Sequence, residues 1–203
     1  MPRTSEKAKS SPDDKLLEKL FNSTPDEWAV SASPSGQLLS DIGPVSTMVI
    51  PADWRPGRQR HNTLGLSFYE EYTPPGEPET ILYFYFRGVP LEPEQAGAFK
   101  QVLKAPPHTL SEAEVEKIKP LLAGKASPDA FEILSLATEL INGKHVLMLT
   151  GIYKGEEKPM IELFVDLDGS GSLLHEIEYQ APLDKYTVYL PQMEAAFKSL
   201  SWK

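Results

Sequence analysis

The stretch from residue 130 to residue 202 constrains the fold most. Four segments of alternating apolar and polar residues follow one another there, separated by turn residues, and they predict strands at about 130–141, 144–153, 159–167 and 172–181. The dipeptide Asn142-Gly143 between two of them is typical of a type I′ hairpin, because both central residues of that turn need a positive φ. Residues 183–200 then follow a helical pattern. This part of the chain therefore predicts an antiparallel meander followed by a helix.

An earlier block of the chain has a similar organisation. Period-two patterns rich in β-branched and aromatic residues predict strands at about 45–50, 64–72 and 80–89. The run Ile81–Phe86 is apolar on both faces, which predicts a central strand. Helical patterns at 93–104 and 111–122 lie between the two blocks, and the second opens with the capping-box spacing. The chain thus predicts an α+β fold, in which helices cover an antiparallel sheet of about six to seven strands in two meanders.

Length and composition predict one main domain. A chain of 203 residues with 40% apolar content can bury one substantial core, and a second full domain would be a tight fit. Residues 1–11 are polar and predict a disordered leader. Residues 12–44 predict an N-terminal helix and extension, since Ser11 and Pro12 offer a helix start. We expect a single α/β domain over residues 45–203.

Charge and cysteine content narrow the classes of function. The formal net charge is −9, which disfavours non-specific binding to nucleic acid or anionic membranes and favours a basic or neutral protein partner. The absence of cysteine excludes disulfides, thiolate catalysis and thiolate-bound zinc. No apolar run approaches the roughly 20 residues of a membrane helix, and the first residues lack the apolar part of a secretory signal. Cytoplasm is the default compartment, although a processed periplasmic or lumenal chain would look the same.

The order of elements over roughly residues 45–202 resembles the PsbP-like fold. The similar motifs are Ile50–Trp54, the hairpin Asn142–Lys144, and the segment Tyr186–Trp202 with Ser199 before the last apolar residues. This family takes in thylakoid-lumen photosystem II subunits, a Ran-binding nuclear import factor and several bacterial proteins of unassigned role. The resemblance implies an α/β/α sandwich and a non-enzymatic role in docking or assembly.

Acidic side chains gather on one face of the hairpin predicted at 159–181. The apolar alternation in both strands, which includes His175 as a hydrogen-bonded core histidine, fixes the register. Glu162, Glu176 and Glu178 then lie together on the opposite face. We interpret them as the solvated polar face of a half-exposed sheet, or as a docking face for a basic partner. In the second case, charge reversal of these three residues weakens partner binding.

The turn at residues 166–171 offers a second kind of site. Asp166, Asp168 and Ser170 match positions 1, 3 and 5 of an EF-hand calcium loop, but position 12 is Ile177 and the flanks are strands. Asp, Gly and Ser are also the residues of an ordinary bulged hairpin turn, here with an odd loop of three or five residues. The turn interpretation is favoured. Calcium, the one cofactor considered, stays an alternative.

A compact cationic loop is expected after Trp54. Arg55, Arg58 and Arg60 could clamp an anionic group, or form a solvated turn. With carboxylates near the 166–176 hairpin, they would give an alternative class, a small hydrolase or ligand-binding enzyme with a deep pocket. No nucleophile elbow or pair of histidines at metal-ligand spacing supports an enzyme. The sequence therefore predicts a non-enzymatic binding or assembly protein that acts through protein–protein contacts.

Overall fold

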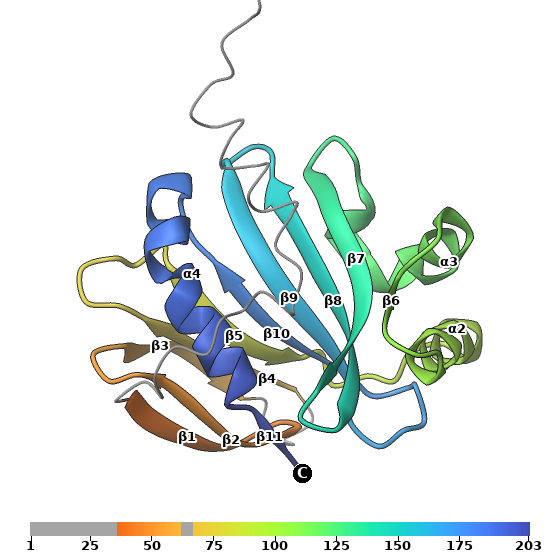
Figure 1. The fold of residues 1–203 in the computed structure, drawn as a ribbon, viewed down its shortest axis with the longest axis horizontal. Coiled ribbons are helices and arrows are strands. Elements are labelled where there is room, and N and C mark those ends of the chain that lie inside the picture. The colour runs from red at the N-terminus through yellow and green to blue at the C-terminus, as the bar shows by residue number, and fades with distance from the viewer. Residues whose placement is uncertain (1–35, 62–66) are drawn as a thin grey trace, which may run out of the picture. The chain divides into compact units, whose positions relative to one another are not determined.

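Eight antiparallel strands form one sheet at the centre of the structure (Figure 1). The computed structural model describes residues 36–61 and 67–203, so the expected leader at 1–11 and most of the extension at 12–44 lie outside the described residues. The order across the sheet is β3-β4-β5-β10-β9-β8-β7-β6. In chain order its strands are β3 (Arg55–His61), β4 (Phe68–Thr73), β5 (Ile81–Phe86), β6 (His108–Thr109), β7 (Phe131–Ile141), β8 (Lys144–Tyr153), β9 (Lys158–Asp166) and β10 (Leu174–Gln180).

A smaller sheet of three strands packs beside the first. Its order is β1-β2-β11, with bounds Gly36–Ile42, Val45–Pro51 and Ser201–Trp202. The strand predicted at 45–50 is thus β2, and it pairs with the end of the chain rather than with the first meander. The α+β class and the antiparallel pairing are confirmed, with more strands than the six to seven expected.

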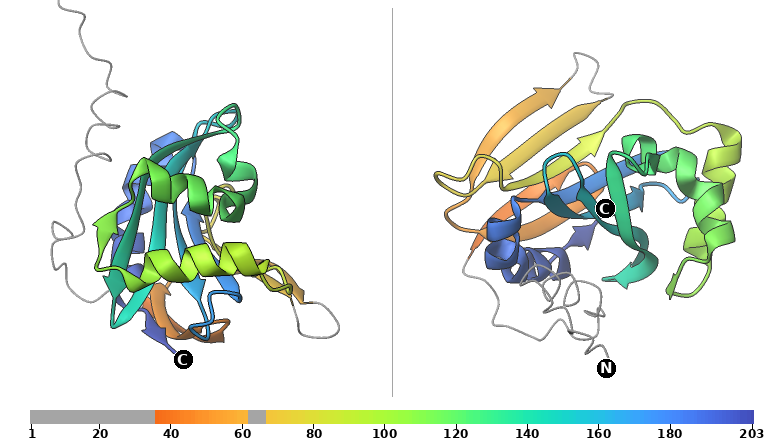
Figure 2. Two further views of the ribbon diagram at one scale, coloured as in Figure 1. Left: turned by 90° about the vertical axis from the view of Figure 1, so that its right-hand side faces the viewer. Right: turned by 90° about the horizontal axis from the view of Figure 1, so that it is seen from above.

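Helices lie on both faces of the large sheet (Figure 2). Helix α2 (Pro93–Lys104) has the predicted bounds, and α3 (Glu112–Ile118) begins after the capping box, in which Ser111 N and Oγ donate to Glu114 Oε2 at 2.9 and 2.7 Å. The helix predicted at 111–122 ends early and continues as a 3-10 segment, η2 (Lys119–Ala126), because Pro120 has no N–H to donate. Helix α4 (Leu183–Lys198) follows β10.

The alternation of residues gives each face of the large sheet its own core. On the face toward α4, which we call the α4 face, Tyr179 stacks on Tyr186 with ring centroids 5.2 Å apart and donates its hydroxyl to Tyr186 O at 3.0 Å. On the opposite face, the α2 face, buried residues of α2, α3 and η2 pack on buried residues of β8 and β9. The main members are Phe99, Ile118, Leu121, Leu147, Leu149, Met160 and Phe164.

The registers of the two predicted hairpins are confirmed. Asn142 and Gly143 have φ of 47° and 83°, as a type I′ turn requires. Leu163 pairs with Ile177 and Glu162 pairs with Glu178, so each set lies on its predicted face. The N–H of Leu167 bonds Leu173 O at 3.2 Å, which leaves five residues in the loop, an odd number as expected.

The β7–β8 turn, the end of α4 and the small sheet form a joint. Asn142 Nδ2 donates to Lys198 O and to Leu200 O, both at 2.7 Å, and Trp202 Nε1 donates to Ile141 O at 2.7 Å. Ser199 Oγ accepts the N–H of Val49 at 2.8 Å. Motifs separated by more than a hundred residues therefore meet at one place. Among the described residues, no helix is long and apolar enough to cross a membrane.

Candidate functional site

The α2 face of the large sheet has two unlike halves. Over β7, β8 and β9 it lies beneath α2, α3 and η2, and we call this the covered half. Over β3, β4 and β5 the three helices do not extend across it, and we call this the open half (Figure 2). Strand β10 lies between the two halves. Its side chains on the α2 face therefore lie at the boundary between the buried core and the exposed surface.

A buried charge cluster marks the boundary between the two halves. It consists of Lys125 from η2 and three carboxylates, Glu162 on β9 with Glu176 and Glu178 on β10. Lys125 Nζ lies 2.8 Å from both oxygens of Glu162 and 2.8 Å from Glu178 Oε2. Glu178 also accepts the hydroxyl of Tyr83 at 2.5 Å. Both Glu162 and Glu178 have no solvent exposure (0%).

Burial and neighbouring charges set the ionisation of this cluster. Burial raises the pKa of Glu162 well above its usual range, although Lys125 opposes the shift. Burial likewise raises the pKa of Glu176. Desolvation would lower the pKa of Lys125, but attraction by Glu162 and Glu178 outweighs it and raises that pKa. An ammonium group that bonds two carboxylates is therefore held in its charged form inside the protein.

The prediction of a solvated acidic face is wrong. The three glutamates do lie on one face, but η2 covers that face and brings Lys125 onto it, so the side chains are buried instead of exposed. Period-two alternation identifies a polar face without telling whether another element covers it. A partner cannot reach Glu162 or Glu178 in this conformation. A hydrolase of the alternative class would need a carboxylic acid with a raised pKa that substrate can reach. The pKa of Glu162 is raised, but solvent reaches neither Glu162 nor Glu178 opposite it.

Arginines line a concavity on the open half, with a volume of about 530 Å³. Arg58 and Arg60 alternate along β3, and Arg87 follows Tyr83 and Tyr85 at the end of β5 with the same period of two. We call this feature the arginine concavity. Its lining consists of Arg58, Arg60, His61, Ser67, Phe68, Tyr69, Tyr85 and Arg87. Residues 55–61 form an exposed strand and not the loop expected from the sequence, because they pair with β4.

Two of the three arginines in the concavity, Arg58 and Arg87, form ion pairs with carboxylates. Glu71 Oε1 accepts the N–H of Arg58 at 2.6 Å, and its carboxylate lies 4.0 Å from the guanidinium of Arg58. Arg87 Nη2 lies 3.6 Å from Glu176 Oε1, which connects the concavity to the buried charge cluster. No carboxylate of the described residues forms an ion pair with Arg60. Arg60 thus offers the most available positive charge.

Arg55, the third arginine predicted for an anion clamp, does not line the concavity. Its Nη1 donates to the backbone oxygens of Ala52 at 3.0 Å and Trp54 at 3.1 Å. The structure therefore brings Arg58 and Arg60 together with Arg87, which the sequence analysis missed. The period-two spacing of Tyr83, Tyr85 and Arg87 was a usable signal, whereas no pattern pointed to Lys125.

The turn at 166–171 uses its carboxylates as hydrogen-bond acceptors. Asp166 Oδ2 accepts the N–H of Gly171 at 2.8 Å, and Asp168 Oδ1 accepts the N–H of Ser170 at 3.0 Å. Burial raises the pKa of Asp166, and the bonds from Ser170 lower that of Asp168. Asp166 Oδ1 is buried and has no hydrogen-bond partner among the described residues. These hydrogen bonds account for the conformation of the turn without a bound ion, but they leave Asp166 Oδ1 without a partner.

His175 is buried on the α4 face, but the expected hydrogen bond is absent. Its ring stacks on Phe86 with centroids 4.3 Å apart, and neither ring nitrogen has a partner among the described residues. The β1–β2 turn packs closely against the imidazole, because a Cβ atom added at Gly43 would lie only 3.0 Å from His175 Nδ1. Burial lowers the pKa of His175 to about 4, aided by the positive charges of Lys203 and Lys144. Apolar neighbours thus keep this imidazole neutral.

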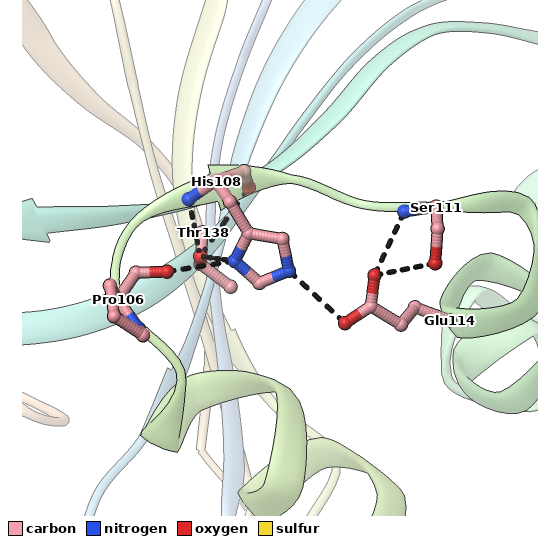
Figure 3. Close-up of polar contacts among 5 residues, drawn as sticks. All are labelled: Pro106, His108, Ser111, Glu114 and Thr138. Atoms are coloured by element: carbon pink, nitrogen blue, oxygen red, sulfur yellow. Dashed lines mark hydrogen bonds and ion pairs between the residues drawn. The ribbon is translucent and has the colours of Figure 1, made fainter.

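A serine, a histidine and a glutamate also meet beside α3 (Figure 3). Ser111 Oγ bonds Glu114 and not His108, so the hydroxyl is not set up as a nucleophile. His108 Nδ1 lies 2.8 Å from Pro106 O, and His108 Nε2 lies 3.1 Å from Glu114 Oε1. Both ring nitrogens face acceptors, and these contacts raise the pKa of His108. This group is a helix-capping clasp rather than a catalytic triad.

Comparison with solved structures supports the fold assignment. The chain is similar to the solution structure of cyanobacterial PsbP (CyanoP) from Synechocystis sp. PCC 6803, at 10% sequence identity and a TM-score of 0.52. The match covers 86% of this chain and 96% of that chain. No protein-family model and no curated protein matches the chain. The protein has a PsbP-like fold.

Proposed function

We propose that the protein is a non-enzymatic binding or assembly protein, and that it docks a partner protein on the open half of its α2 face. The observation that carries the proposal is the arginine concavity, because it presents charged and aromatic side chains that the fold leaves uncovered. Arg and Tyr are enriched where proteins bind one another. The PsbP-like fold is consistent with an accessory role.

The uncovered side chains contrast with their counterparts in the covered half. There, the same sheet face is filled by apolar side chains and by a charge cluster whose members pair with one another. In the open half, the side chain of Arg60 is exposed and forms no ion pair within the described residues, and Tyr85 lines the concavity. Exposed charges on this surface can interact with complementary charges of a partner protein. The docking residues therefore shift from the predicted glutamates to Arg58, Arg60 and Arg87.

The test is site-specific photo-cross-linking in cells of the source organism. A benzophenone side chain at Tyr85 reports contacts in the concavity, and the same side chain at Leu38 on β1, which is 64% exposed, serves as the matched control. We expect a defined cross-linked partner from position 85 and not from position 38. The purified partner should then bind the native chain and bind Tyr85→Ala more weakly. Equal cross-linking from both positions contradicts the proposal.

A second candidate function is a calcium-stabilised hairpin at the 166–171 turn. The specific observation is the buried Asp166 Oδ1 without a partner, next to Asp168 and Ser170, whose oxygens are of the kind that calcium prefers. Without an acid at the twelfth position, we expect weak binding. The test is a calcium titration of thermal stability. A midpoint that rises with calcium in the native chain but not in Asp168→Ala supports this candidate, and no rise contradicts it.

A further inference from the structure

We propose that the arginine concavity binds the carboxylates of an acidic segment in the partner protein. This inference rests on the proposed function and names the chemistry of its partner. It revises the expectation of a basic partner, because the three glutamates predicted to dock such a partner, Glu162, Glu176 and Glu178, are buried beside Lys125. The local sign of charge, and not the total, decides what a contact surface recognises.

Three guanidinium groups from two strands line one concavity. Arg58 and Arg60 come from β3, and Arg87 comes from the end of β5, two positions across the sheet. A guanidinium is planar and always charged, and its forked donors match the two oxygens of a carboxylate. Because Arg60 forms no ion pair within the described residues, it provides a first contact that an incoming carboxylate does not have to compete for.

The openness of the concavity favours a chain segment over an enclosed small molecule. Strand β3 is the edge of the large sheet, and each of its seven residues is exposed. An extended segment can lie along such an edge while its side chains reach the guanidinium groups. Tyr69 and Tyr85 add apolar contact area on the same surface. These features suit a short peptide segment.

The acidic surroundings limit how much negative charge the concavity accepts. Glu70 lies 3.3 Å from His61, and Glu71 and Glu176 already pair with Arg58 and Arg87. A long phosphate backbone needs an extended track of cations, which three arginines beside three glutamates do not provide. A segment with two or three carboxylates fits this balance better than a nucleic acid.

Glu71 and Glu176 act as internal counter-ions that the ligand replaces. Arg87 Nη2 is 3.6 Å from Glu176, so an incoming carboxylate competes for this guanidinium. Neutralising Glu176 therefore frees Arg87, whereas neutralising Arg87 removes a donor. The two changes have opposite effects on anion binding although they affect one ion pair. A general loss of structure cannot produce that pattern.

The experiment measures binding of fluorescein-labelled hexaglutamate to the full chain by fluorescence anisotropy at low salt. We expect Arg60→Gln and Arg87→Gln to weaken binding at least about tenfold, the effect of losing a hydrogen bond to a charged group. Glu176→Gln should tighten it severalfold. Arg55→Gln is the matched control, because Arg55 lies on the same strand, outside the concavity, and bonds backbone oxygens. Circular dichroism verifies that each variant is folded.

Several outcomes overturn the inference. These are no hexaglutamate binding at millimolar protein, equal loss in Arg55→Gln and Arg60→Gln, or weaker binding in Glu176→Gln. Inorganic phosphate or a thymidine oligonucleotide that displaces the peptide at lower concentration than unlabelled hexaglutamate also overturns it. A partner cross-linked at Tyr85 without hexaglutamate binding keeps the proposed function and rejects acidic recognition. Hexaglutamate binding without a cross-linked partner supports the anion chemistry and contradicts docking.

Discussion

The covered and open halves of the α2 face both carry charged side chains, but these side chains end in opposite environments. In the covered half, η2 supplies Lys125, and the carboxylates of Glu162 and Glu178 become part of the core. In the open half, Arg58 and Arg60 stay at the surface. A polar strand face is thus core or surface according to what packs on it.

The two halves also differ in what their charges do. Removing a partner from the buried charge cluster leaves a charge without solvation, which costs far more than losing an exposed ion pair. The ion pairs of the buried charge cluster therefore stabilise the packing of η2 on the sheet. In the open half, Arg60 is exposed and forms no ion pair within the described residues, so we expect the fold to tolerate its loss and its charge to be available for binding. The predictions below test this division, from the largest expected effect to the smallest.

Replacing Lys125 by methionine should destabilise the protein most. The change leaves two fully buried carboxylates, Glu162 and Glu178, without their ammonium partner, so we expect the free energy of unfolding to fall by about 3–5 kcal/mol. Urea denaturation measures this. Arg60→Gln in the open half is the contrast, with an expected change below about 0.5 kcal/mol. Similar losses in both variants contradict the division between the halves.

His175 should make stability depend on pH. Its pKa is lowered from 6.5 to about 4 in the folded protein, so below pH 6.5 the unfolded chain binds a proton that the folded chain does not. The free energy of unfolding should therefore fall between pH 6.5 and pH 4, by about 3 kcal/mol in total from this group. Denaturation curves of the native chain and of His175→Phe isolate the effect. The same slope with pH in both proteins speaks against a buried neutral imidazole.

Asn142→Ala should cost less than these changes. It removes two hydrogen bonds, to Lys198 O and Leu200 O, and puts alanine at a φ of 47°. We expect a loss of about 1–2 kcal/mol in the free energy of unfolding. Asn142→Gly separates the two causes, since glycine tolerates the backbone angle but also lacks the amide. If the alanine variant is as stable as the native chain, the joint does not contribute to stability.

The clasp at His108 should give the smallest effect. The bonds with Pro106 O and Glu114 raise the pKa of His108, so its contribution to stability is complete below pH 6.5 and is lost as the pH rises through the raised value. The bonds from Ser111 help to lower the pKa of Glu114 to about 2, so this carboxylate stays charged over the whole pH range in which His108 titrates. Thermal midpoints of the native chain and His108→Gln should differ more at acidic than at alkaline pH. A constant difference would rule out the charged clasp.

Local patterns predicted most of the fold. Period-two alternation predicted the bounds of β8, a helical pattern predicted those of α2, and the backbone requirement of Asn142 and Gly143 identified the type I′ turn. These elements depend on neighbours in sequence, which a pattern contains. The strand Arg55–His61 was missed, because its arginines, proline and glycine are atypical of strands and pairing with β4 overrides the local preference. The two-residue strands β6 and β11 have no pattern long enough to recognise.

The candidate site was less accessible to sequence analysis. The register placed Glu162, Glu176 and Glu178 on one face correctly, but the residue that buries them comes from a segment with a backbone kink at Ala123, where φ is 50°. No local signal places Lys125 over those strands. Arg87 was within reach of the period-two rule, whereas the meeting of Arg58, Arg60 and Arg87 depends on the order of strands across the sheet. Sequence patterns did not predict which segments distant in the chain lie next to one another.

The bond between Ser199 and Val49 has a consequence for how the chain is made. It joins residues 150 positions apart, and β11 pairs with β2 at the same place. While the ribosome is still adding the intervening segments, β2 has its hairpin partner β1 but lacks β11. The three-stranded sheet and the joint around Asn142 can therefore be completed only after residues 199–202 have emerged from the exit tunnel. A nascent chain stalled before this point has β1 paired with β2 but leaves the other edge of β2 without β11.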